Sequence, residues 1–318
     1  MSIFFRRMNM SAVYDVAIIG AGPAGMTAGI YASRAMLKTV IIEKGVAGGL
    51  MALTDKLDNW PGELSVSGAD LSERMLKQAT GFGCEFQMGE VIKIDRLSDG
   101  NFMVSLSDDE KILAKTVIYA AGSVPRLADI EGEKEFAGRG VSYCAVCDAA
   151  FYRGLKVAVL GGGDSALKEA LYLTKFADEV TIIHRRQEFR AEKIIQEEVK
   201  NNPKIKFVLD SIAVKIDGSD FVEKVIVKNV KTEEMSVVNV DGVFVFLGYI
   251  PKVDPVRHFV ELAEDGRIKA DYRMHTNVEG FFAAGDVIQK LVNQVSTAVG
   301  DGATAATAAE HFISSAKK

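Results

Sequence analysis

Apolar and glycine-rich segments follow one another in a defined order near the start of the chain. An apolar, β-branched run begins at Tyr14 and leads into a glycine-rich turn over Gly20–Gly25. An amphipathic helical pattern continues to about Met36, and a second apolar run covers Thr39–Glu43. This order of strand, turn, helix and buried strand predicts the βαβ unit of a dinucleotide-binding fold.

The same order returns in the middle of the chain. A strand beginning at Lys156 leads into Gly161–Ala166, a helix runs to about Lys175, and the next strand covers Val180–His184. In both copies, 23 residues separate the first glycine of the turn from the last residue of the second strand. One glycine pattern alone is weak evidence, but two copies with equal spacing and context predict two nucleotide sites.

Two further segments that resemble each other indicate how the two copies are connected. Residues 116–125 and 243–251 each form an apolar strand followed by glycine and then proline, and we interpret them as the points where the chain crosses between domains. The predicted fold is α/β, with two Rossmann-like nucleotide-binding domains, the second inserted in the first. The predicted domains are 1–117 with 249–318, and 118–248. Alternating patterns predict additional strands over 101–106, 116–121, 222–230 and 243–247.

Composition narrows the class of protein. Of 318 residues, 48% are hydrophobic and 25% are charged, which is typical of a globular chain. No run of 18 apolar residues occurs and the net charge is −5, so we expect binding to neither membranes nor nucleic acid. Three cysteines are too few for a disulfide framework and favour a reducing, cytoplasmic location. The residues before the first strand lack the apolar core of a signal peptide, so we expect a short frayed leader there.

The first glycine-rich turn has the features of a pyrophosphate site. Gly20 permits the tight bend, Gly22 lets the backbone approach the ligand, and Gly25 lets the helix pack against the strand. Glu43 ends the second strand, where its carboxylate can accept ribose hydroxyls and would repel a 2′-phosphate, so the site suits FAD or NAD. The predicted cofactor-binding residues of this segment are Gly20, Gly22, Pro23, Ala24, Gly25 and Glu43.

The second turn differs at the position that corresponds to Glu43. His184 stands there, and three arginines follow it. Guanidinium groups pair bidentately with phosphate oxygens, so this loop predicts recognition of the 2′-phosphate of NADPH. The alternative is a solvated basic loop without a ligand. The predicted cofactor-binding residues here are Gly161, Gly163, Asp164, Ser165, His184, Arg185, Arg186 and Arg190.

Near the C-terminus, an apolar strand runs into Gly285-Asp286. A carboxylate at this position can bind a ribityl or ribose hydroxyl, although Gly-Asp alone is common. The helix that begins near Gln294 and Val295 can aim the N–H groups of its first turn at an electron-rich ligand. We therefore include these four residues in the predicted cofactor site.

Cys144 and Cys147 form the only CxxC pair in the sequence. A structural zinc ion needs four ligands, and no further cysteine or histidine has suitable spacing, so we predict no metal site. A CxxC pair beside a βαβ unit in a reducing compartment indicates a dithiol/disulfide couple. Asp148 follows it and is a candidate acid/base for thiol exchange, the alternative being a helix or turn cap. Cys84 is expected to be an inert buried thiol.

Together, the segments GAGPAG, NWPG, CAVCD, GGGDSA, HRRQEFRA and AAGD resemble the low-molecular-weight thioredoxin reductases, class II members of the pyridine nucleotide-disulfide oxidoreductase family. The resemblance covers about Tyr14 to His311. It implies a homodimeric flavoprotein that holds FAD, takes electrons from NADPH and reduces thioredoxin. It also implies that Cys147 faces the flavin, that Cys144 attacks the partner disulfide, and that Asp148 is the acid/base residue. Gly49 and Asn59 lie in matching segments and are expected to bind the cofactor.

The sequence departs from the family pattern close to these motifs, and Lys168-Glu169 stands where the family has an acid pair after GGGDSA. Leu50 replaces a glutamine, Ala149 replaces a glycine and Asn293 replaces an arginine. These departures leave three alternatives open. They are a reductase of the same architecture that uses ferredoxin or another donor, a small-molecule dithiol oxidase that uses oxygen, and a flavin-binding regulator without catalysis.

Overall fold

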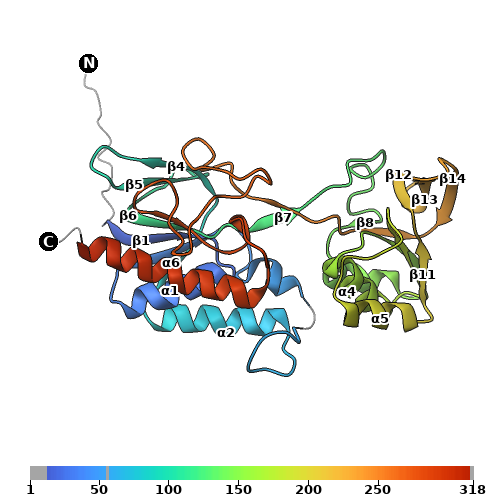
Figure 1. Cartoon of the computed structure of the whole chain (residues 1–318), viewed down its shortest axis with the longest axis horizontal. Helices are drawn as coiled ribbons and strands as arrows, with labels where there is room; N and C mark the ends of the chain where they lie inside the picture. The colour runs from blue at the N-terminus through green and yellow to red at the C-terminus, as the bar shows by residue number, and fades with distance from the viewer. Residues whose placement is uncertain (1–12, 55–56, 316–318) are drawn as a thin grey trace, which may run out of the picture. The chain divides into compact units, whose positions relative to one another are not determined.

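The structure is a computed structural model that describes residues 13–54 and 57–315 (Figure 1). It divides into two compact units. Unit 1 comprises Met1–Ser123 and Pro251–Lys318, and unit 2 comprises Val124–Ile250, which lies between them in the sequence. The leader expected before the first strand lies outside the described residues.

A seven-stranded sheet forms the centre of unit 1. The strand order is β3-β2-β1-β6-β5-β4, and β17 pairs with β6 beyond the point where β5 ends. Strands β3, β2, β1, β6 and β17 are parallel, and the last four residues of β1 are buried, as expected for a sheet covered on both faces. The strands are β1 (Tyr14–Ile19), β2 (Thr39–Glu43), β3 (Glu85–Met88), β4 (Val91–Arg96), β5 (Phe102–Leu106), β6 (Lys111–Tyr119) and β17 (Phe281–Ala283).

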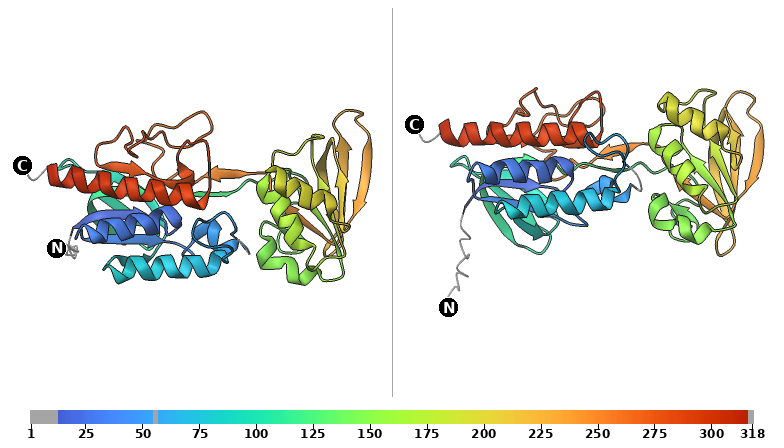
Figure 2. Two further views of the ribbon diagram at one scale, coloured as in Figure 1. Left: turned by 60° about the horizontal axis from the view of Figure 1, so that its bottom comes forward. Right: turned by 90° about the horizontal axis from the view of Figure 1, so that it is seen from below.

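Three long helices pack side by side in unit 1, with α1 between α2 and α6 (Figure 2). Helix α6 approaches α1 closely because glycine and alanine line the contact. A Cβ atom added to Gly302 would lie 2.1 Å from the backbone oxygen of Ala24. The helices are α1 (Pro23–Arg34), α2 (Gly68–Gly81) and α6 (Val295–Ser315), with 3-10 turns η1 (Gly49–Leu53) and η3 (Gly285–Val287).

Unit 2 repeats the βαβ pattern around a parallel five-stranded sheet of order β11-β10-β9-β15-β8. The strands are β8 (Val141–Ser142), β9 (Lys156–Leu160), β10 (Glu179–Ile183), β11 (Ile205–Val208) and β15 (Gly242–Val245). The helices are α3 (Ala145–Asp148), α4 (Asp164–Leu173) and α5 (Lys193–Asn201), with the 3-10 turn η2 (Ala149–Tyr152). The predicted α/β fold with two Rossmann-like units is confirmed.

Unit 2 also contains an antiparallel sheet, of which the sequence predicted only the central strand. It consists of β12 (Ser211–Gly218), β13 (Val222–Asn229) and β14 (Met235–Asn239). Val225 and Val227 of β13 share a buried core with Val243 of β15, so this sheet covers one face of the parallel sheet. The two crossings of the chain, β7 (Ser123–Pro125) and β16 (Tyr249–Pro251), pair with each other.

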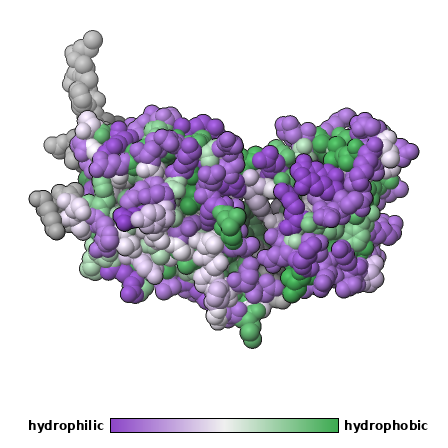
Figure 3. Space-filling view, in the orientation of Figure 1, coloured by the Kyte–Doolittle hydropathy of each residue, from purple (hydrophilic) through white to green (hydrophobic). Residues whose placement is uncertain are grey.

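The surface drawn in Figure 3 is mostly hydrophilic, with hydrophobic residues in small separate patches. Isolated apolar side chains are exposed in several places, for example Leu64 and Leu291. Within the described residues, no helix combines the length and the apolar character that crossing a membrane requires.

The α1–α6 contact predicts opposite effects for two glycines of α6. Gly302→Ala should lower the free energy of unfolding by about 1–3 kcal/mol, because its Cβ atom would overlap the backbone of α1. Gly300→Ala is the matched control, since no atom lies within 4 Å of its added Cβ. It should stabilise the helix by about 0.5–1 kcal/mol. Urea unfolding followed by circular dichroism measures both, and equal effects of the two substitutions would contradict the packing argument.

Candidate functional site

The three glycines of the first turn differ in how closely other atoms approach them. Gly20 has φ +105°, and an added Cβ would lie 2.4 Å from the backbone oxygen of Ala120. A Cβ on Gly25 would lie 1.8 Å from the oxygen of Gly20, so α1 packs directly on the turn. Beside Gly22, by contrast, the space within 4 Å of an added Cβ is empty. The backbone at the start of α1 is therefore open to a ligand, and the unpaired N–H groups of a helix start favour an anion there.

Glu43 is held beside this turn by backbone donors. Its Oε2 accepts a hydrogen bond from Ala21 N at 2.8 Å, and its Oε1 accepts one from Gly45 N at 2.9 Å. A carboxylate oxygen can accept more than one hydrogen bond, so both oxygens retain capacity for ribose hydroxyls. Gly49 is part of the same region, since a Cβ on it would lie 3.7 Å from Gly22 Cα.

Residues distant in the sequence complete the surroundings of the turn. An added Cβ on Gly285 would lie 3.0 Å from the Cβ of Ala24, so the Gly-Asp segment reaches the first turn of α1. Asn59 Nδ2 donates to Gln294 Oε1 at 3.1 Å, which ties the loop after η1 to the residue before Val295, where α6 begins. Each of the two contacts thus joins predicted site residues that lie far apart in the sequence.

Asp286 belongs to a charged cluster that the sequence did not reveal. Lys290 Nζ lies 2.6 Å from Asp301 Oδ2 and 3.8 Å from Asp286 Oδ1, and Asp301 Oδ2 also accepts from Gly285 N at 3.1 Å. Burial raises the pKa of the Asp286 carboxyl, while Lys290 and Arg267 oppose that rise. The four-residue spacing of Asp286 and Lys290 could have suggested from the sequence that these two side chains lie close together. The contact between Lys290 and Asp301 depends on how α6 packs, so the sequence does not indicate it.

The turn of unit 2 has the same geometry as the turn of unit 1. Gly161 has φ +147° and an added Cβ would lie 2.3 Å from the oxygen of Phe246, whereas the space beside Gly163 is open. Asp164 is the first residue of α4, and its Oδ1 accepts from Glu192 N at 2.7 Å. Ser165 follows it in the first turn of the helix.

His184 forms a wall of the second turn. An added Cβ on Gly162 would lie 2.4 Å from His184 Cε1, and the imidazole packs 5.4 Å from the ring of Phe189. Only 7% of His184 is exposed, and burial lowers its pKa, with the charges of the nearby arginines acting in the same direction. The imidazole is therefore neutral at physiological pH.

The positive charge of this loop comes from the arginines. Arg185, Arg186 and Arg190 are all exposed, and none of them has a carboxylate partner among the residues that the structure describes. Arg190 N donates to Gly162 O at 2.9 Å, which fixes this part of the loop beside the glycine-rich turn. Three exposed guanidinium groups therefore follow β10 in the loop of unit 2.

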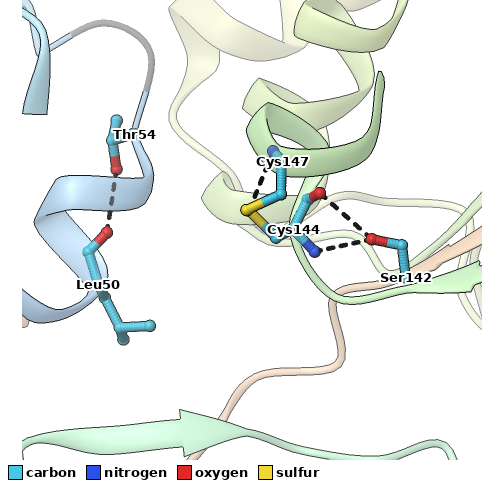
Figure 4. Close-up of a disulfide and its surroundings, with 5 residues drawn as sticks. All are labelled: Leu50, Thr54, Ser142, Cys144 and Cys147. Atoms are coloured by element: carbon cyan, nitrogen blue, oxygen red, sulfur yellow. Dashed lines mark hydrogen bonds between the residues drawn. A yellow bond between two sulfur atoms is a disulfide. The ribbon is translucent and has the colours of Figure 1, made fainter. Parts of the chain in front are cut away.

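Cys144 and Cys147 form a disulfide at the start of α3 (Figure 4). Cys144 is the N-cap residue, and its Sγ accepts a hydrogen bond from Cys147 N at 3.2 Å. The buried Ser142 holds the backbone of Cys144 on both sides, because its Oγ accepts from Cys144 N and donates to Cys144 O. The predicted dithiol/disulfide couple is confirmed. Cys84 is buried, and burial raises the pKa of its thiol to about 11, which makes it unreactive.

The residues after the disulfide explain one departure from the family pattern. Ala149 has φ −55° and ψ −33°, an ordinary right-handed conformation, so alanine fits there without backbone strain. Asp148 is the last residue of α3. Burial raises the pKa of Tyr152, and the negative charges of Asp148 and Asp241 raise it further. Asp148 directly follows Cys147 in the chain, and both lie in α3.

Comparison with known proteins gives a consistent result. Residues 14–302 match the family described as pyridine nucleotide-disulphide oxidoreductase. The chain is 46% identical to the thioredoxin reductase of Peptoclostridium acidaminophilum, over 96% of this chain and 98% of that protein. Among solved structures, the thioredoxin reductase of Lactococcus lactis has a TM-score of 0.93 and 44% identity, covering 95% of this chain and 99% of that one.

A more distant solved structure bears on the choice of electron donor. It is a ferredoxin-flavin thioredoxin reductase from Clostridium acetobutylicum, with 30% identity and a TM-score of 0.52 over 95% of this chain and 98% of that one. The family match and the near-complete coverage of its relatives agree with the glycine-rich turns and the disulfide. The chain therefore belongs to the pyridine nucleotide-disulphide oxidoreductase family, among the low-molecular-weight thioredoxin reductases.

Proposed function

We propose that this chain is a thioredoxin-disulfide reductase that passes electrons from NADPH, through FAD, to the Cys144–Cys147 pair and then to thioredoxin. The observation that carries the proposal is the Cys144–Cys147 disulfide, which lies at the start of α3, the short helix that packs against α4 in unit 2. A disulfide of this kind can accept two electrons and pass them to another disulfide by exchange. The relatives named thioredoxin reductase support the same activity.

FAD is assigned to unit 1 because the residues there fit it. Thioredoxin reductases of this family use FAD and NADPH. The open backbone at Gly22 and the start of α1 suit the pyrophosphate, Glu43 suits a ribose, and Asp286 suits a hydroxyl of the ribityl chain. When bound, FAD supplies a two-electron relay between a nicotinamide and a disulfide.

NADPH is assigned to unit 2 because of the charges around its turn. Arg185 and Arg186 would bind the 2′-phosphate, whose oxygens match the guanidinium fork. The neutral His184 replaces the carboxylate that Glu43 provides in unit 1, so nothing at this position repels the phosphate. The pyrophosphate would lie at the open backbone of Gly163.

The dithiol reaction follows from the geometry around Cys144. Two electrons and two protons convert the Cys144–Cys147 bond into two thiols. The Cys144 thiolate attacks the thioredoxin disulfide to form a mixed disulfide, and Cys147 then displaces the thioredoxin dithiol and re-forms the original bond. The N–H of Cys147 that donates to Cys144 Sγ also stabilises a thiolate there, and Asp148 is positioned to accept or return a proton.

The ferredoxin-fed alternative has weaker support. The relative that uses ferredoxin by name is 30% identical, whereas relatives named simply thioredoxin reductase reach 46%. The arginine loop with three unpaired guanidinium groups also fits the 2′-phosphate of NADPH. Assembly as a homodimer and residence in the cytoplasm stay predictions.

The assignment of NADPH predicts the effect of removing the arginines. Arg185→Ala with Arg186→Ala should raise the KM for NADPH by about ten- to a hundredfold, because charged hydrogen bonds to the phosphate are lost. The KM for NADH should change little. Lys193→Ala with Lys200→Ala removes two exposed charges from α5 and is the matched control, expected to affect neither donor. A wild-type enzyme that uses NADH and NADPH equally would contradict the assignment.

The exchange mechanism predicts the effect of removing each thiol. Cys144→Ser and Cys147→Ser should each abolish thioredoxin reduction while FAD stays bound. Cys147→Ser should also accumulate a mixed disulfide with thioredoxin through Cys144, visible on a non-reducing gel. Cys84→Ala is the control and should retain turnover, because that thiol is buried away from solvent. Turnover by either single serine variant would remove the dithiol from the electron path.

A further inference from the structure

A fully buried carboxylate lies in the loop that precedes the disulfide. Glu133 is 0% exposed, and none of the lysines, arginines or histidines in the described part of the chain forms an ion pair with it. Three donors surround it instead. Its Oε1 accepts from Ala128 N and from Tyr143 Oη, both at 2.9 Å, and its Oε2 accepts from Asp129 N at 2.6 Å. A buried carboxyl group without an ion-pair partner needs hydrogen bonds such as these to offset the cost of its burial.

One of the three donors connects Glu133 to the redox pair. Tyr143 directly precedes Cys144, and among the described residues its hydroxyl is the one side-chain group that donates to Glu133. Burial, followed by the hydrogen bond and charge of Glu133, raises the pKa of Tyr143 well above its ordinary value. The phenol therefore keeps its proton and acts as a donor at every physiological pH.

The other two donors connect Glu133 to the segment that follows the first chain crossing. Asp129 has φ +55°, a left-handed conformation that costs a non-glycine residue free energy, and its N–H points to the carboxylate. Three residues earlier, Arg126 N donates to Gly248 O at 2.8 Å, where the chain returns. Glu133 thus joins the residue before Cys144 to the part of unit 2 next to both crossings.

We propose that Glu133 and Tyr143 are positioning residues for Cys144 in the dithiol exchange. Ser142 and Cys147 N fix Cys144 from within its own loop, and the Glu133–Tyr143 hydrogen bond fixes the same loop to the body of unit 2. Holding the attacking sulfur in one orientation speeds the displacement of a sulfur in the partner disulfide. The inference rests on the proposed thioredoxin reductase activity. It adds two residues to the site, which so far consists of the two cysteines, Asp148 and the nucleotide-binding turns.

The direct test is Tyr143→Phe, which removes one hydroxyl and leaves the ring in place. We expect the kcat for thioredoxin reduction to fall about tenfold. The KM for NADPH, the FAD content and the rate of flavin reduction by NADPH should stay at the wild-type values. In the NADPH-reduced enzyme, alkylation of Cys144 by iodoacetamide, measured by mass spectrometry, should slow while that of Cys147 does not.

Tyr14→Phe is the matched control, because Tyr14 Oη donates to Glu85 Oε2 at 2.6 Å in unit 1, far from the cysteines in the sequence. It should leave every rate unchanged. If Tyr143→Phe lowers only the melting temperature and keeps the wild-type kcat, the proposal is wrong. It is also wrong if flavin reduction by NADPH falls as much as thioredoxin reduction.

Glu133→Gln supplies a second variant, in which the amide cannot accept from all three donors at once. It should lower kcat at least as much as Tyr143→Phe, and the tyrosine variant alone decides the question if the glutamine variant does not fold. Full wild-type kcat in a folded Glu133→Gln enzyme would overturn the proposal. Thioredoxin reduction by the wild type is measured first, so a failure of the proposed function is recognised separately.

Discussion

At the first turn of α1, backbone atoms approach one another so closely that side chains are excluded. No Cβ fits between Gly25 and the oxygen of Gly20, and Gly302 of α6 faces the backbone oxygen of Ala24 with as little room. Gly285 packs on the methyl group of the same alanine. These close approaches fix α1, α6 and the Gly-Asp segment around one point, where three of the segments assigned to FAD meet.

The two units show how one backbone geometry serves two ligands. In each, a glycine with positive φ bends the chain, and a second glycine leaves the backbone open at a helix start. The difference lies at the end of the second strand. In unit 1, Glu43 presents a carboxylate held by backbone N–H groups, and in unit 2 the neutral His184 precedes exposed arginines. This difference in charge is the reason why we assign the 2′-phosphate of NADPH to unit 2 and not to unit 1.

The sequence predicted what depends on local order along the chain. Turn glycines, apolar strands and the CxxC pair can each be recognised from a few consecutive residues. Both βαβ units and the disulfide predicted from them are present in the structure. Helix α2 was missed although its signals are local, since Ser67 caps it and Leu71, Met75 and Ala79 bury one face. Strand β14 gave a weak pattern because most of its residues are exposed.

Contacts between distant residues were not predictable in the same way. Asn59 and Gln294 are 235 positions apart, and the position of Asp301 beside Lys290 depends on the packing of α6. In the sequence, Glu133 lies in a charged stretch and has the features of a surface residue. The structure shows instead that it is buried and accepts a hydrogen bond from Tyr143. Such polar contacts depend on three-dimensional packing, which one sequence without structural information does not specify.

The central claim is that electrons from NADPH reach the disulfide as well as the flavin. The most direct measurement is an anaerobic titration of the purified, FAD-loaded protein with NADPH, followed by absorbance of the flavin and counting of free thiols. Each NADPH delivers two electrons, so full reduction of the flavin and the disulfide should take about two equivalents per chain and expose two new thiols. Complete flavin reduction after about one equivalent, with the disulfide still intact at excess NADPH, would contradict the account.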